Sequence, residues 1–171
     1  SINWAYQWTY GKLVKNYPGV ERYYTNIKYK KDSAHYEPQT AVDVFDPTYS
    51  DYIAERAAII VGKNKTDGIV LDWWHDYHPI VDQTARTRSQ FKKKRNEIIQ
   101  KFRQNLGSNK LIIANVGARK ATDTHDNLNG VFIEFIPSWF PVVGYNCRDF
   151  LLAEQLLQLH DKHLLPPKVI A

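Results

Sequence analysis

Three polar residues stand where apolar runs typical of buried β-strands come to an end. They are Asp72, Asn115 and Glu134, and each follows three or more apolar positions. In an α/β barrel the loops at the carboxyl ends of the strands build the active site. We therefore expect these three side chains to gather at one edge of a sheet.

Asp72 and Glu134 are predicted to form the acid pair of a hydrolase that cleaves O-glycosidic bonds. Glycoside hydrolysis uses one carboxylic acid that protonates the leaving oxygen and one carboxylate that acts as nucleophile or base. Glu134 lies among four apolar residues, a setting that raises the pKa of a carboxyl group towards that of a general acid. From the residues alone, Asp72 could instead be a loop or capping acid, and Asn115 either a substrate contact or a turn residue before Gly117.

Tryptophans near the predicted strand ends suggest carbohydrate binding, because sugar rings stack on aromatic faces. The alternative is core filling, above all for whichever of Trp73 and Trp74 points away from the site. The predicted substrate-binding residues are Asn115, Trp74, Trp139, Trp8 and His75.

His75, Asp76 and His78 are residue types that could bind zinc, but their spacing matches no metal motif and no fourth ligand is evident. We interpret them as loop residues that line the cleft and expect neither metal nor cofactor. The basic run Lys92–Arg95 accounts for much of the net charge of +5 and is interpreted as a solvated helix face. Nucleic-acid binding through this run is the less favoured hypothesis, since no recognition motif accompanies it.

Strands and helices alternate from Asp46 onward. A helix is predicted from Asp46-Pro47 to a stop at Gly62, and a second from a cap at Asp82 to Gly107. Between and after them come continuous apolar runs, which indicate parallel strands buried on both faces. These runs are 68–74, 111–116 and 130–136, with a further strand opening at Pro167.

The 171 residues suffice for a single domain, 1–171, and the longest apolar runs fall far short of the roughly 20 residues of a membrane span. The repeat predicts an α/β fold of the (β/α)8 TIM-barrel type, because no G-x-G-x-x-G loop supports an open nucleotide-binding sheet. A full barrel needs about 250 residues, so we expect an incomplete one that lacks N-terminal and last strands. Its open edge would favour self-association. Residues 2–10 are interpreted as an early strand and 17–40 as a long loop.

Four short motifs, in this order, resemble glycoside hydrolase-like barrels related to family 114, the endo-α-1,4-polygalactosaminidases. The motifs are Val42–Pro47, Thr66–Asp72, Ile113–Asn115 and Asn129–Glu134. The resemblance covers about three quarters of the chain and implies Asp72 as nucleophile or base and Glu134 as acid. The sequence thus favours a glycosidase, with a non-catalytic carbohydrate-binding barrel or an inactive fragment as the alternative.

Overall fold

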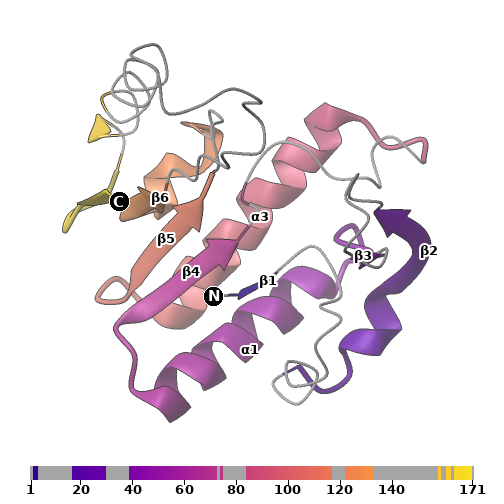
Figure 1. Cartoon of the computed structure of the whole chain (residues 1–171), viewed down its shortest axis with the longest axis horizontal. Helices are drawn as coiled ribbons and strands as arrows, with labels where there is room; N and C mark the ends of the chain where they lie inside the picture. The colour runs from indigo at the N-terminus through magenta and orange to yellow at the C-terminus, as the bar shows by residue number, and fades with distance from the viewer. Residues whose placement is uncertain are drawn as a thin grey trace, which may run out of the picture.

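A parallel sheet with two long helices forms the centre of the structure (Figure 1). The computed structural model describes residues 2–3, 17–29, 39–72, 74, 84–116, 122–132, 158, 161–162 and 164–170. The sheet order is β1-β4-β5-β6-β7, and every neighbouring pair is parallel. These elements are β1 (Ile2–Asn3), β4 (Gly68–Asp72), β5 (Leu111–Asn115), β6 (Gly130–Phe132), β7 (Val169–Ile170), α1 (Tyr49–Asn64) and α3 (Arg88–Leu106). The expected α/β class with a parallel sheet is confirmed.

The two faces of this sheet differ in how far they are covered. One face is buried in a core shared with both helices, and its residues are Ile69, Leu71, Ile112, Ala114 and Val131. On the other face Val70 is 37% exposed and Phe132 is 39% exposed. The expectation of strands buried on both faces is therefore wrong at these two positions. The opposite face carries apolar side chains that water can reach.

Helix α1 begins and ends later than the sequence suggested. The Asp46 carboxylate accepts hydrogen bonds from the Thr48 backbone N–H, at 2.8 Å, and from its hydroxyl, at 2.6 Å, so Asp46 closes a turn before the helix instead of capping it. The helix then runs through Gly62 and ends at Lys65, which takes a left-handed conformation with φ 51°. Gly62 lies inside the helix, where glycine lowers the stability of the helix by a modest amount.

Helix α3 starts with a complete capping box. The Thr87 hydroxyl accepts from the Gln90 backbone N–H at 3.2 Å, and the Gln90 side chain accepts from the Thr87 backbone N–H at 2.8 Å. This cap replaces the expected one at Asp82, which lies outside the described residues. The predicted stop at Gly107 is confirmed, as is the buried face of the helix, formed by Phe91, Ile98, Ile99, Phe102 and Leu106.

The segment interpreted as a long loop contains a second, two-stranded sheet. Strands β2 (Tyr24–Tyr29) and β3 (Gln39–Val42) pair antiparallel after the short 3-10 helix η2 (Val20–Tyr23). A tyrosine cluster joins this unit to α1, with the rings of Tyr23 and Tyr49 in edge contact at 5.0 Å and those of Tyr23 and Tyr52 also at 5.0 Å. The loop prediction was wrong because β2 is rich in polar residues and tyrosine and β3 is only four residues long, so neither has a continuous apolar run.

Arg103 ties together the amino-terminal ends of the strands. Its guanidinium donates to the carbonyl oxygens of Gly107, at 3.1 Å, and Asn127, at 2.9 Å, and to the Asn129 side-chain oxygen at 2.7 Å. A fourth bond reaches the Lys110 carbonyl at 2.6 Å. Asn129 is buried, and its side-chain oxygen also accepts from the backbone N–H of Ile112 in β5, so Arg103 and Asn129 together hold this end of the sheet.

No helix within the described ranges is long and apolar enough to cross a membrane.

Figure 1 shows the arrowheads of β4 and β5 pointing to the end of the molecule where α1 and α3 begin and where β2 and β3 lie. In α/β folds ligands bind at that carboxyl edge. The candidate site is therefore sought there.

Candidate active site

Asp72 is the last residue of β4 and lies, half-buried, on the less covered face of the sheet. Strand β4 is an interior strand of the sheet, because it pairs with β1 on one side and with β5 on the other. Side chains alternate along a strand, so Asp72 shares its face with Val70 and not with the buried Leu71. The backbone thus directs this carboxylate away from the helix-covered core.

Asn115 ends the neighbouring strand β5 and reaches Asp72 directly. Its side-chain amide nitrogen donates to a carboxylate oxygen of Asp72 at 3.0 Å. The donor side chain is buried, and the two residues are 43 positions apart in the chain, so the contact exists only because the strands are paired in register. Of the predicted site residues, the structure brings these two together, and the bond fixes how the carboxylate is turned.

Trp74, two residues after Asp72, is part of the hydrophobic core. It is 0% exposed, and its indole N–H donates to the Thr124 hydroxyl at 2.8 Å. Its backbone N–H donates to the Asn115 carbonyl, also at 2.8 Å. A ring without exposed surface offers no face for a sugar, so the structure favours core filling, the alternative stated above for this tryptophan.

Thr124 lies in the 3-10 helix η3 (Thr122–Asn127) and is buried. Sequence reasoning did not single it out, because a threonine in a polar connection between strands carries no pattern of its own. The signal that could have indicated it is its partner Trp74, because a buried indole N–H needs a hydrogen-bond acceptor.

The basic run of α3 divides into two pairs with different surroundings. Lys92 and Lys93 are exposed, as expected of a solvated face. Lys94 and Arg95 are buried, so that expectation is wrong for them. The Arg95 guanidinium lies 5.7 Å from the centre of the Trp74 ring, where cation and ring attract each other. Of this run, Arg95 therefore packs against Trp74 in the core.

Phe132 is an aromatic residue at the site that sequence reasoning placed only inside an apolar strand. It pairs in register with Asn115 across β5 and β6, and its exposed side chain lies on the same face. Side chains alternate between the two faces along each strand. Phe132 could therefore have been placed on the same face as Asn115 if the register between β5 and β6 had been known. An exposed ring beside a carboxylate and an amide is suited to contact a sugar.

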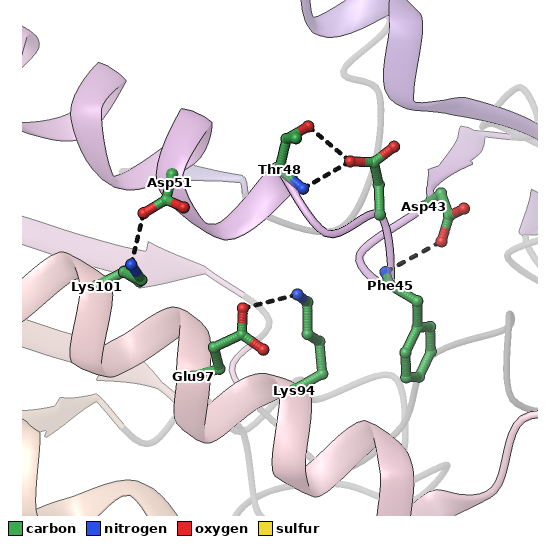
Figure 2. A network of polar contacts seen from close by, with 8 residues as sticks. Asp43, Phe45, Thr48, Asp51, Lys94, Glu97 and Lys101 are labelled. Atoms are coloured by element: carbon green, nitrogen blue, oxygen red, sulfur yellow. Dashed lines mark hydrogen bonds and ion pairs between the residues drawn. The ribbon is translucent and has the colours of Figure 1, made fainter.

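Polar contacts lie on α1, on α3 and in the segment before α1 (Figure 2). Asp51 and Lys101 form an ion pair at 2.7 Å between the helices, and Lys94 pairs with Glu97 at 2.8 Å within α3. The hydrogen bonds from the Thr48 side chain and backbone hold the pKa of Asp46 below its usual value. The ion pair of Asp51 with Lys101 links α1 to α3, and the Thr48 contacts hold the turn before α1.

The other predicted site residues, Glu134, Trp139, Trp8 and His75, lie outside the described residues. The same holds for Asp76 and His78, which the sequence analysis considered for metal binding. In the part of the chain that the structure describes, no group of three or more His, Cys, Asp or Glu side chains could hold a metal ion.

The sequence matches no protein-family model and no curated protein sequence. Among solved structures, the glycoside hydrolase domain of PelA from Pseudomonas aeruginosa has a TM-score of 0.62 at 11% identity, covering 97% of this chain and 66% of that one. The chitinase domain of the spore coat protein CotE from Clostridium difficile has a TM-score of 0.51, also at 11% identity, covering 75% of this chain and 43% of that one. The chain therefore spans less than half of the CotE domain. At such identities the likeness shows the fold, which is glycoside hydrolase-like.

Proposed function

We propose that the chain is a glycoside hydrolase that cleaves O-glycosidic bonds of an oligo- or polysaccharide, with Asp72 and Glu134 as its carboxylate pair. The observation that carries this is the hydrogen bond between Asn115 and Asp72 at the carboxyl edge of a parallel sheet. Both neighbours named above are domains of the same enzyme class, which supports the proposal. The sheet would be part of a (β/α)8 barrel.

The roles of the two acids follow from what the reaction requires. Asp72 would be the nucleophile or base, since its orientation is already fixed by an amide donor. Glu134 would be the acid, the role that the resemblance implies for it, and in the sequence it follows the exposed Phe132 by two residues. A carboxyl separation of about 5 to 5.5 Å would give retention, and about 6.5 to 9.5 Å inversion.

Phe132 would contact the substrate. Aromatic rings contribute binding area against the apolar face of a sugar without taking part in the chemistry. Replacement by alanine is therefore expected to raise KM and leave kcat near that of the parent. The resemblance to family 114 adds weight to the enzyme class but not to a particular glycan, because a cationic aminosugar polymer suits a chain with a net charge of +5 poorly.

The test is a hydrolysis screen of the purified chain against soluble glycans, with Asp72→Asn and Glu134→Gln as variants. General acid or base groups contribute roughly 10² to 10⁴-fold, so each variant should lose activity on that scale. The matched control is Asp67→Asn, because Asp67 is an exposed acid that directly precedes β4 at the opposite end of the sheet. Full activity in Glu134→Gln or Asp72→Asn would refute the proposal.

A carbohydrate-binding module without activity is the second candidate, favoured by the exposed Phe132 beside the site. Calorimetric titration with the same glycans separates the two functions. Binding by a parent that turns over no glycan, retained in Asp72→Asn and lost in Phe132→Ala, would identify the binding module.

A further inference from the structure

Three hydrogen bonds connect the Asp72 carboxylate to Thr124 in the 3-10 helix η3. Thr124 accepts from the Trp74 indole at 2.8 Å, the Trp74 backbone N–H donates to the Asn115 carbonyl at 2.8 Å, and the Asn115 amide donates to Asp72 at 3.0 Å. Thr124, Trp74 and Asn115 are all buried. The contacts therefore form one continuous path from η3 to the candidate site.

Each bond in this path restricts the next. The indole is held at its edge by Thr124 and faces the Arg95 guanidinium, so the ring has little freedom to turn. Because ring and backbone belong to one residue, this also places the Trp74 N–H against the end of β5. The end of β5 carries the amide that orients the carboxylate. A change at Thr124 should thus be felt at Asp72.

We propose that Asn115 is a positioning residue for the Asp72 carboxylate and that Thr124 supports it through Trp74. The inference rests on the proposed function for its consequence in catalysis, and it differs from the sequence interpretation of Asn115 as a substrate contact. A misplacement of about 1 Å in a reacting group can lower the rate about 10²-fold. Positioning therefore predicts a loss in kcat, whereas substrate contact predicts a rise in KM.

The decisive variants are Thr124→Val and Thr124→Ser, which separate shape from hydrogen bonding. Valine keeps the branched shape and removes the acceptor, whereas serine keeps the acceptor and removes a methyl group. If the hydroxyl supports Asn115, Thr124→Val lowers kcat about tenfold with KM within twofold, and serine restores most of it. A role in packing alone predicts the reverse order of the two variants. Asn115→Leu should lower kcat further, again with KM unchanged.

A second readout does not depend on activity. In nitrogen-15 NMR spectra of the folded chain, the Asn115 side-chain amide protons and the Trp74 indole proton report the bonds directly. We expect Thr124→Val and Trp74→Phe to shift the Asn115 amide signal and speed its exchange with water, and Thr124→Ser to leave it near the parent position. Trp74→Phe serves as the second variant because it removes the donor and leaves the hydroxyl in place.

The two readouts keep the failure of the function apart from the failure of the inference. If the chain hydrolyses no glycan, the proposed function fails, and the NMR shifts still decide whether Thr124 supports Asn115. Unchanged Asn115 amide signals in Thr124→Val overturn the inference. So does an active parent in which the signals shift but kcat does not.

Discussion

Replacing Arg103 by methionine should destabilise the fold at the amino-terminal ends of the strands. Methionine keeps most of the apolar stem and removes all four hydrogen bonds of the guanidinium. Three of these bonds go to the backbone carbonyls of Gly107, Lys110 and Asn127, residues that are themselves partly exposed. The fourth goes to the buried Asn129, which also bonds to the start of β5.

The size of the effect follows from these surroundings. A hydrogen bond to a charged group contributes about 1.5 to 3 kcal/mol, and bonds to hydrated partners contribute less. Burial lowers the pKa of Arg103, which shows that the cation is partly desolvated, and its removal relieves some of that cost. We therefore expect a net loss of about 3 kcal/mol. For a chain of 171 residues this lowers the Tm by about 6 to 12 °C.

Urea unfolding followed by circular dichroism measures this loss, and an unchanged slope against denaturant would show that the unfolded state is the same. The matched control is Lys93→Met, an exposed cation on the same helix. The reasoning is refuted if Arg103→Met loses less than about 1 kcal/mol or no more than the control.

Three further predictions concern single features of the fold. A Cβ at Gly68 would overlap the backbone of Leu111 in the paired strand, so Gly68→Ala should destabilise the chain by more than about 3 kcal/mol or prevent folding, as judged by expression and circular dichroism. Thr87→Ala should lose about 1 kcal/mol in a thermal melt because the capping box is broken, whereas Thr87→Ser should retain most of it. Burial raises the pKa of both Tyr17 and Tyr52 to about 12, from 10.0. The folded state keeps these phenols protonated, so their contribution to stability is complete below pH 10 and is lost between about pH 10 and 12. Absorbance titration at 295 nm should show a late phase near pH 12, and one that is complete near pH 10 would contradict the assigned burial.

The strands β4, β5 and β6 were predictable because their apolar runs are continuous, and a run such as 111–116 has few other uses in a chain of this size, whereas β2 and β3 were missed. The buried face of α3 was predictable from its spacing. The helix starts were not, since Asp46 serves equally well in a turn as at a cap and only the Thr48 contacts distinguish the two. The local sequence does not show whether the Asp46 carboxylate accepts hydrogen bonds within a turn or at the start of the helix.

From the sequence, Asp72 and Asn115 could be placed at the ends of successive strands, but their contact could not be predicted. Their contact depends on the register between β4 and β5, which the sequence does not state. Thr124 and Phe132 were missed for the same reason: both acquire their role from a neighbour distant in sequence. The basic run shows a further limit of pattern reading, because four adjacent cations on a helix necessarily point in several directions, and Lys94 and Arg95 point inward.

The order of strands in the main sheet has a consequence for how the chain reaches its folded state. Ile2 pairs with Leu71, and Val131 pairs with Ile170, so each edge strand joins the sheet by closing a long stretch of chain. Contacts between residues far apart in sequence form slowly, because the entropy of the intervening chain is lost before they stabilise the fold. The antiparallel pair β2 and β3 closes a short stretch and can form first. We therefore expect the edge strands β1 and β7 to be among the last parts to form and among the first to open in hydrogen exchange.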